Sequence, residues 1–301
     1  MVSEKNFKIW GVSYGLVGDL IMGLPVLDYF EEKYPDSYKI WVIQKKVAFM
    51  APFFLNHPLI DKIHITEEWD GFGFNDRLLR DECNVKCIID DWKHDPVDWY
   101  NYRDCIDETA RVAGVMDFNP APYIKYPKLC RWFDTGKRET VSSYSKENSL
   151  LSSKATNDNI ISIFPFATAN DTTGIGRSPS VKWWSDMVSI MNKMGHTVYQ
   201  FGMPSDRRIK NTIQYNTLTF FEQIQIALST KMSIGTDSGN MWVMGAYSHP
   251  AIHLMTQWLP NHTENKFALA PKNINGFDVF AKDGVDNIKH DVVMDTIGGI
   301  I

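Results

Sequence analysis

Three polar stretches in the second half of the chain follow apolar runs and contain residues that suit a phosphate-bearing ligand. In the first, Asp237, Ser238 and Gly239 stand between the apolar run at 232–235 and a segment rich in small residues. If that segment is a helix, its first N–H groups have no partners within the helix and attract anions. The alternative is that Asp237 or Ser238 only caps the helix.

The second stretch follows the apolar run at 160–166 and ends at Lys182, before a helix expected from about Ser185. Thr168 offers a hydroxyl, and Lys182 offers a mobile positive charge that could neutralise a diphosphate. A single loop lysine is more commonly a solvated surface group. The inference therefore depends on two anion-suited loops at successive strand ends of one sheet.

The third stretch ends an expected strand at 197–202, where Gly202 precedes a turn containing Asp206. In dinucleotide-binding folds an acidic residue at a comparable place accepts hydrogen bonds from ribose hydroxyls. The alternative is that Asp206 begins a helix, where a carboxylate is favoured by the helix dipole.

A possible general base lies near the N-terminus, in the segment GLVGDLIMGLPVLDYF at 15–30. Its glycines do not follow the G-x-G-x-x-G order, and the chain has no G-x-x-x-x-G-K-[ST] motif, so neither standard nucleotide loop is present. Asp19 stands at the expected start of a helix. Its carboxylate could cap that helix or accept a proton from a substrate.

Strand-like and helical segments alternate along both halves of the chain. Strands are expected at 7–12, 39–43, 60–65, 85–90, 160–166, 197–202, 232–235 and 251–255. Helices are expected at 19–33, 101–114, 185–194 and 220–229, with another of small residues after 239.

Two helices carry further expectations. Pro25 should bend the first helix, because proline removes a backbone donor. In the helix that Gly195 ends, the spacing of Met187, Ile190, Met191 and Met194 predicts a core-facing stripe.

The alternation is interrupted between Asp134 and Asn159 by a stretch rich in Ser, Thr, Lys and Asn. We therefore predict an α/β protein with two doubly wound, Rossmann-like domains at 1–135 and 160–301, joined by a linker at 136–159. Ligands of such sheets bind at the carboxyl ends of the parallel strands, so the active site is expected in a central cleft that the two domains face.

The overall composition limits the classes of partner. The chain has 301 residues and a formal net charge of -5, which argues against a nucleic-acid backbone as its main partner. The N-terminal residues lack a signal-peptide core, and no apolar run is long enough to span a bilayer. A cytoplasmic protein is expected. Its four cysteines, which lack metal or disulfide spacing, are expected to be reduced thiols.

Several segments together resemble a known family. They are GDLIMGLPVLDYFEEKYPD, WVIQKKVAFMAPFFLNHPLIDKI, FPFATA with VKWW, and TLTFFEQIQIALSTKMSIGTDSGNMWVMGAYSHP. In order and spacing the chain resembles the ADP-heptose:lipopolysaccharide heptosyltransferases of glycosyltransferase family 9, outside residues 66–100 and the linker.

This resemblance implies a GT-B enzyme that transfers a sugar with inversion and without a metal. It implies that Asp19 is the base and that Leu218 contacts the nucleotide base through its main chain. The residues that it implies for the diphosphate and the adjoining loop are Ala167, Thr168, Lys182, Asp237, Ser238 and Gly239. No D-x-D metal motif occurs in the chain.

The chain departs from the family pattern at three places in the donor half. Phe166 and Trp242 replace a glycine and a histidine, and the segment DTTGIGRSPS lengthens the loop before Lys182. The acceptor is expected to meet the first domain, where Gly18 leaves backbone space. Arg77 and Arg103 lie there among aromatic residues suited to acidic sugars, although such arginines are commonly surface groups.

We therefore expect an inverting, metal-independent glycosyltransferase that needs no cofactor beyond its co-substrate, a nucleoside diphosphate sugar. An ADP-sugar is favoured as donor and heptose is one candidate sugar. The expected acceptor is a saccharide or glycolipid such as a lipopolysaccharide core, with at most peripheral contact with the inner face of a membrane. Two alternatives stay open: a catalytically silent nucleotide-sugar-binding protein and a GT-B-like sugar-nucleotide epimerase.

Overall fold

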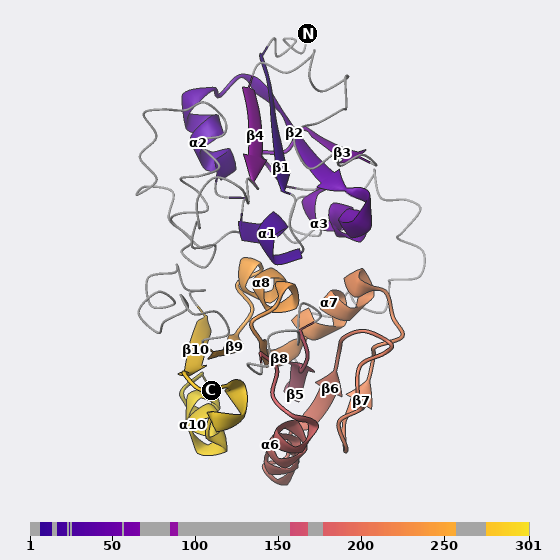
Figure 1. Cartoon of the computed structure of the whole chain (residues 1–301), viewed down its shortest axis with the longest axis vertical. Coiled ribbons are helices and arrows are strands. Elements are labelled where there is room, and N and C mark those ends of the chain that lie inside the picture. The colour runs from indigo at the N-terminus through magenta and orange to yellow at the C-terminus, as the bar shows by residue number, and fades with distance from the viewer. Residues whose placement is uncertain are drawn as a thin grey trace. The chain divides into compact units, whose positions relative to one another are not determined.

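Apolar runs in the first half of the chain form the parallel strands of one sheet, as the computed structural model shows (Figure 1). The strands are β1 (Phe7–Ser13), β2 (Ser37–Gln44), β3 (Lys62–Thr66) and β4 (Val85–Ile89), in the order β3-β2-β1-β4. All the pairings are parallel. The four strands predicted for this half are confirmed.

The structure describes residues 7–13, 17–22, 24, 26–55, 57–66, 85–89, 157–167, 177–256 and 275–300. The chain divides into two compact units. Unit 1 comprises Met1–Lys137 with Leu269–Pro271, and unit 2 comprises Arg138–Ala268 with Lys272–Ile301. The first strand of unit 2 begins at Asn157, inside the segment predicted as linker. The helix predicted at 101–114 lies outside the described residues.

The helical segment after β1 is interrupted where proline was expected to disturb it. It forms α1 (Val17–Met22) and α2 (Val26–Lys33), with a turn at Leu24. The Leu24 amide donates to the Ile21 carbonyl at 3.1 Å, and the Leu27 amide donates to the Leu24 carbonyl at 3.0 Å. After β2 come two short helical segments that the sequence did not predict, η1 (Lys45–Met50) and α3 (Ala51–Phe54).

Unit 2 contains a larger parallel sheet. Its described strands are β5 (Asn157–Phe164), β6 (Thr197–Gln200), β7 (Ile213–Gln214), β8 (Thr230–Thr236), β9 (Ala251–Thr256) and β10 (Gly276–Ala281), in the order β10-β9-β8-β5-β6-β7. Strands β6 and β7 are added on one side of β5, and β8, β9 and β10 are then added in turn on the other side. Strand order therefore reverses between β5 and β8, which are neighbours in the sheet. A doubly wound sheet has its topological switch point at such a place.

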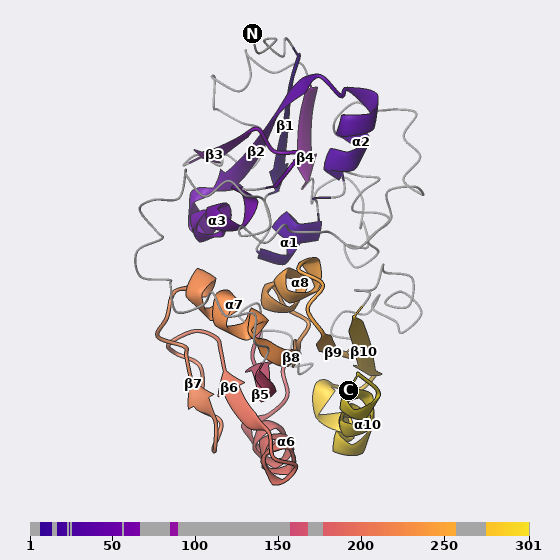
Figure 2. The same ribbon diagram turned by 180° about the vertical axis from the view of Figure 1, so that it is seen from behind.

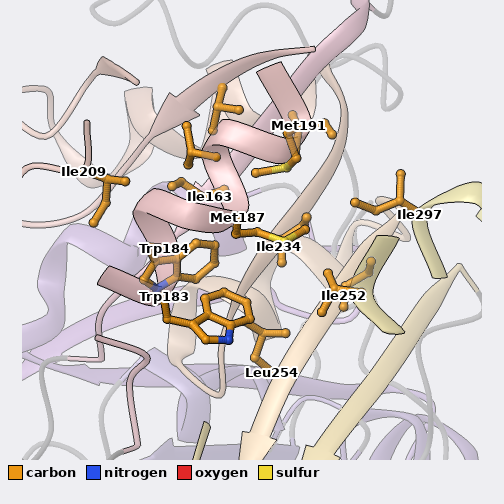
Figure 3. Packing of buried hydrophobic residues seen from close by; sticks show 14 of the residues in the cluster. Ile163, Trp183, Trp184, Met187, Met191, Ile209, Ile234, Ile252, Leu254 and Ile297 are labelled. Atoms are coloured by element: carbon orange, nitrogen blue, oxygen red, sulfur yellow. The ribbon is translucent and has the colours of Figure 1, made fainter. Parts of the chain in front are cut away.

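Helices cover both faces of this sheet (Figures 1 and 2). They are α6 (Val181–Lys193), α7 (Phe220–Leu228), α8 (Gly239–Ala246) and α10 (His290–Ile300), with the short η6 (Val285–Asn287) before the last. On one face, α6 and α10 enclose an apolar core with the inward side chains of the strands (Figure 3). On the other face lie α7 and α8, where Gly235 of β8 packs directly against Met241.

The sequence misplaced the ends of α6. The helix begins at Val181, four residues before the predicted start, so Lys182 belongs to its first turn. Met187 and Met191 are fully buried as expected. Met194 is 59 % exposed, so its place in the predicted core stripe is wrong. The helix has ended at Lys193, and Gly195, with φ of +91°, turns the chain away.

Candidate functional site

The described candidate residues of unit 2 stand in loops at one edge of its sheet. Strands β5, β6, β7, β8 and β9 are parallel, so their carboxyl ends meet at the same edge. Those loops contain Ala167, Gly202, Asp206, Leu218, Asp237 and Ser238, with Gly239 opening the next helix. Thr168 lies outside the described residues.

Among the described residues, no side chain caps the start of α8. Ser238 is its N-cap residue and has an extended backbone (φ -153°, ψ 161°), but its hydroxyl makes no capping hydrogen bond. The Oγ atom is buried and has no hydrogen-bond partner among the described residues. The Thr236 hydroxyl, at the end of β8, is buried and unpartnered in the same sense. Buried polar atoms are normally satisfied, so these two hydroxyls at one strand end call for a partner such as a water molecule or a ligand.

The amide groups of the same turn also suit an anion. The Met241 and Trp242 amides donate to the Ser238 carbonyl at 3.0 and 3.2 Å. Within the part of the chain that the structure describes, the amides of Gly239 and Asn240 have no such partner. The helix dipole adds partial positive charge at this point. The alternative that Ser238 serves as an ordinary cap does not hold, and the anion site stays a prediction.

The carboxylate of Asp237 contacts Arg177 rather than the helix. The Arg177 Nη2 atom lies 3.5 Å from Asp237 Oδ2, and Nε donates to the Asp237 carbonyl at 3.0 Å. Both side chains are largely buried, with exposed fractions of 14 % and 6 %. Arg177 comes from the loop after β5 and reaches the loop after β8. Its role was missed by sequence reasoning, because nothing local links residues 60 positions apart.

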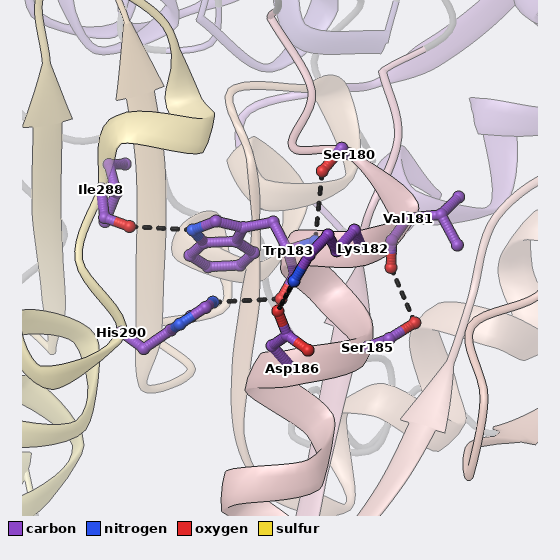
Figure 4. A network of polar contacts seen from close by, with 8 residues as sticks. All are labelled: Ser180, Val181, Lys182, Trp183, Ser185, Asp186, Ile288 and His290. Atoms are coloured by element: carbon purple, nitrogen blue, oxygen red, sulfur yellow. Dashed lines mark hydrogen bonds and ion pairs between the residues drawn. The ribbon is translucent and has the colours of Figure 1, made fainter.

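Lys182 has a different partner. Its Nζ atom donates to Asp186 Oδ2 at 2.6 Å, one turn along the same helix (Figure 4). This hydrogen bond raises the pKa of Lys182. The side chain is 84 % exposed. In the structure Lys182 contacts Asp186 of its own helix. Its contact with a diphosphate stays a prediction.

The loop after β6 is held in a shape that depends on glycine. Gly202 has φ of +146°, and a Cβ atom there would collide with the Asp206 carboxylate. Asp206 Oδ2 accepts a hydrogen bond from the Met203 amide at 2.7 Å, and burial raises the pKa of Asp206. The alternative that Asp206 begins a helix is wrong, because it lies in a turn. Its contact with a ribose stays a prediction.

Gln223 connects two of the candidate loops and was also missed by sequence reasoning. Its Oε1 accepts from the Gly202 amide at 2.9 Å, while its Nε2 donates to the carbonyls of Gly202 and Leu218 at 3.0 and 2.9 Å. The loops predicted to meet the ribose and the base are therefore tied together by one buried amide. The available signal was a glutamine on the apolar face of a predicted helix, four residues before the buried Ala227.

The loop after β5 is organised by its own contacts. The Ala167 amide donates to Ser178 Oγ at 2.9 Å, and the Arg207 guanidinium lies over the Phe166 ring at 5.2 Å. Trp242, which replaces the family histidine, meets His253 edge-on with ring centroids 6.5 Å apart. Phe166 and Trp242, which depart from the family pattern, thus each contact a side chain within unit 2.

In unit 1, Gly18 and Asp19 are the second and third residues of α1, which follows β1. This edge of the sheet also contains Gln44 at the end of β2, whose buried Nε2 atom has no hydrogen-bond partner within the described ranges. Gln44 was not among the predicted residues. Arg77 and Arg103 lie outside the described residues, so the acceptor site stays a prediction.

Metal-binding clusters and membrane-spanning helices are both absent from the described ranges. No group of three or more His, Cys, Asp or Glu side chains there is placed to hold a metal ion. None of the helices there is both long and apolar enough to cross a bilayer.

Comparisons with known proteins identify the fold. The chain matches no family model and no curated protein sequence. Among solved structures, it is similar to a family 9 glycosyl transferase from Veillonella parvula, with a TM-score of 0.66 and 13 % identity over 100 % of this chain and 99 % of the other. The ADP-heptose lps heptosyltransferase II of E. coli gives a TM-score of 0.64 and 12 % identity over 98 % of both chains.

A third similar structure is the E. coli heptosyltransferase WaaC with ADP, with a TM-score of 0.54 and 11 % identity over 98 % of this chain and 100 % of the other. Identities this low show the fold. The protein has the GT-B fold, with two doubly wound α/β domains, as predicted. The similarity to the heptosyltransferases of family 9 that the motifs indicated extends to the fold. The central cleft between the domains stays a prediction.

Proposed function

We propose that this protein is a glycosyltransferase that moves a sugar from a nucleoside diphosphate to a saccharide or glycolipid acceptor. The observation that carries the proposal is the open start of α8 at the carboxyl edge of a GT-B domain, where the buried Ser238 hydroxyl lacks a partner among the described residues. A diphosphate would supply the acceptor oxygens that this turn lacks. Because one similar structure contains ADP and another ADP-2-deoxy-2-fluoro heptose, an ADP-sugar is the first donor to test.

The proposed reaction is a single displacement with inversion. The acceptor hydroxyl oxygen forms a bond to the anomeric carbon as the bond from that carbon to the diphosphate breaks. Asp19 takes the hydroxyl proton, a step that contributes about two to four orders of magnitude in rate. The departing diphosphate gains negative charge, which the α8 start and a neighbouring cation stabilise without requiring a metal.

The rest of the donor is assigned to the loops that Gln223 connects. Gly202 and Asp206 are proposed to meet the ribose, and the main chain of Leu218 is proposed to meet the base. The Leu218 amide already donates to the Tyr215 carbonyl at 3.1 Å, so its carbonyl is the group offered to the base. That carbonyl also accepts from Gln223, and its second lone pair allows another hydrogen bond.

The nucleotide can be identified by thermal unfolding with ADP, GDP, UDP and CDP. A ligand that binds the native state raises the melting temperature by mass action, and a concentration of 100 times Kd adds about 2.7 kcal/mol. We expect one diphosphate, ADP first, to give the largest rise. If none of the four changes the melting temperature, the proposal of a nucleotide-sugar enzyme is wrong.

Transfer is then tested with the corresponding sugar donors and the Asp19→Asn variant. We expect this variant to lose about 100-fold or more of the transfer rate while it keeps its nucleotide affinity. The matched control is Asp36→Asn, which neutralises an exposed carboxylate just before β2, at the opposite edge of the unit 1 sheet. Wild-type transfer by Asp19→Asn would exclude the assigned base. Bound but unconverted donor would instead indicate a binding protein, and an altered sugar without acceptor would indicate an epimerase.

A further inference from the structure

The end of β9 has no role in the proposed function, although it lies at the same edge of the sheet as the candidate loops. The strands of unit 2 follow the order β10-β9-β8-β5-β6-β7. The ribose and base are assigned to the loops after β6 and β7, and the diphosphate to the turn after β8. A donor laid along this edge has its sugar beyond the diphosphate. The next strand end in that direction is that of β9, which finishes at Thr256.

Thr256 comes directly beside the turn that opens α8. Thr236 of β8 pairs with Leu254 of β9, and the Asp237 amide still donates to the Leu254 carbonyl at 3.2 Å. Ser238 continues the chain with an extended backbone. The pairing of the two strands therefore brings Ser238 about level with Thr256, at the outer limit of the sheet.

The side chains of Thr236 and Thr256 lie on the same face of the sheet. They follow by two residues the core side chains Ile234 and Leu254, which pack with α6 (Figure 3). Successive side chains of a strand alternate between its two faces, so residues two apart share a face. The apolar core of this face therefore ends in hydroxyl groups at the carboxyl edge, where their residues are only 0 and 1 % exposed.

The hydroxyls of Thr236, Ser238 and Thr256 are all buried, and none has a hydrogen-bond partner within the described ranges. A buried hydroxyl is costly when the hydrogen bonds it made to water are not replaced. Elsewhere in the same sheet such groups are paired, since Thr230, at the other end of β8, donates to the Ser162 hydroxyl at 3.1 Å. The shortage of partners is a property of the edge where the ends of β8 and β9 meet.

We propose that the Thr256 hydroxyl binds a hydroxyl group of the donor sugar, beside the diphosphate at the start of α8. The inference rests on the proposed function and deepens it. A threonine hydroxyl has one donor and two acceptor lone pairs, so it can pair with a sugar hydroxyl in either direction. It carries no charge, which suits a neutral hexose or heptose. A site that hydrogen-bonds one substrate hydroxyl discriminates strongly against analogues without it, so Thr256 is assigned as a specificity-determining residue.

The test compares two dissociation constants, both measured by isothermal titration calorimetry without acceptor. The first ligand is the nucleoside diphosphate that most stabilises the wild-type protein, and the second is the tightest-binding of its glucose, mannose and heptose conjugates. Thr256→Val removes the hydroxyl and nearly keeps the shape of the side chain. We expect the Kd of the conjugate to rise about five- to tenfold, the range for loss of one hydrogen bond, and that of the diphosphate to stay within about twofold.

Three further variants control this comparison. Thr256→Ser keeps the hydroxyl and should keep the wild-type ratio of the two Kd values. Thr236→Val removes an equally buried hydroxyl one layer deeper, at the end of β8, so any effect should fall on both ligands alike. Thr197→Val changes an exposed residue at the start of β6, at the opposite edge of the sheet, and should leave both Kd values within about twofold. Thermal unfolding without ligand verifies that each variant folds.

The outcomes distinguish this inference from the function on which it rests. If Thr256→Val changes both Kd values equally, or neither, Thr256 does not contact the sugar; the assignment is then wrong and the proposed function stands. An equal loss in Thr256→Ser would show that packing rather than the hydroxyl is responsible, and would also overturn the assignment. If the wild-type protein binds none of the four diphosphates, or none of the sugar conjugates, both proposals fail together.

Discussion

Three helices of unit 2 begin at the carboxyl edge of the same sheet, but their first turns differ. In α6, the Ser180 hydroxyl accepts from the Trp183 amide at 3.1 Å (Figure 4), and the Ser180 amide donates to Asp286 at 2.6 Å. In α7, Thr219 and Glu222 form a reciprocal capping box. In α8, the N-cap serine makes no capping hydrogen bond, although it is the same residue type as in α6.

The difference separates helix starts that serve stability from one that is available for binding. A side-chain cap satisfies the first amides of a helix within the chain, and so competes with any external anion for them. At α6 and α7, side chains of the protein itself accept hydrogen bonds from amides of the first turn. At α8 the capping residue is present, but among the described residues its hydroxyl and the amides of Gly239 and Asn240 have no hydrogen-bond partner.

The largest expected effect comes from introducing a side-chain cap at the start of α8. Ser238→Asp places a carboxylate at the N-cap of α8, where it can accept from the first-turn amides and repel a phosphate. We expect nucleotide affinity to fall about 100-fold, with some loss of thermal stability because the new carboxylate is buried beside that of Asp237. Calorimetric titration with the best-binding diphosphate measures the first effect, and thermal unfolding without ligand measures the second.

The matched control is Ser180→Asp, which makes the same substitution at the start of α6. It should change nucleotide affinity by less than about threefold, since that start is already capped. Equal losses of affinity in the two variants would mean that the two helix starts do not differ in function.

The next effect concerns Gln223 of α7, which holds the loops at Gly202 and Leu218 together. Gln223→Met keeps nearly the same volume but leaves the Gly202 amide and two carbonyls without their partner. We expect the free energy of unfolding to fall by about 2 to 3 kcal/mol, and nucleotide affinity to fall because the two candidate loops lose their link. Urea unfolding and calorimetry measure these quantities. Gln225→Met, two residues along the same helix, is the control and should be close to neutral; comparable destabilisation by both would refute the linking role of Gln223.

A smaller effect compares the two serines directly. Ser180→Ala removes a formed cap and should lower the free energy of unfolding by about 1 kcal/mol. Ser238→Ala removes a buried hydroxyl that caps nothing, so it should be neutral or slightly stabilising while it weakens nucleotide binding. Denaturant unfolding of both variants tests the pair. A loss of stability in Ser238→Ala as large as in Ser180→Ala would show that Ser238 caps α8 in solution.

The smallest effect is a pH dependence at α7. Hydrogen bonds from the Thr219 hydroxyl and amide lower the pKa of Glu222 below its ordinary value of 4.5. Its contribution to stability is therefore present above that value and is lost as the pH falls through the lower, folded-state pKa. Glu222 is solvent-accessible, so we expect Glu222→Gln to cost only about 0.5 kcal/mol at pH 7. The difference from wild type, measured by urea unfolding, should shrink as the pH falls below the ordinary pKa of 4.5 and vanish below the folded-state pKa; a constant difference would contradict this cause.

The sequence predicted most strands because each is a short apolar run bounded by turn residues. It missed β7, which has only two residues, and β10, which is only partly buried and alternates irregularly. It placed the start of α6 too late, although Ser180 before Val181 is a legitimate N-cap signal. These errors lie at the edges of the sheet and at a helix end, where local patterns are weakest. The sequence also missed η1, α3 and the whole of α10.

The candidate site was predictable in its loops but not in its contacts. Glycine, serine and aspartate after an apolar run indicate a binding loop at a strand end, and this located Asp237 to Gly239. The contact of Arg177 with Asp237 and the hydrogen bonds of Gln223 depend on which strands become neighbours. No local pattern encodes that order, so tertiary structure was needed to find them.

The close packing of α8 against Gly235, which has no Cβ atom, has a consequence for the kinetics of nucleotide binding. A Cβ atom there would lie 2.7 Å from the Met241 sulfur and 3.0 Å from Phe164 Cβ. Helix α8 therefore packs against β8 too closely for any side chain at this position. A helix packed so closely has its first turn fixed before any ligand arrives. We therefore expect nucleotide association with this domain to be a single concentration-dependent step without a slow rearrangement, which stopped-flow fluorescence of a labelled diphosphate would reveal.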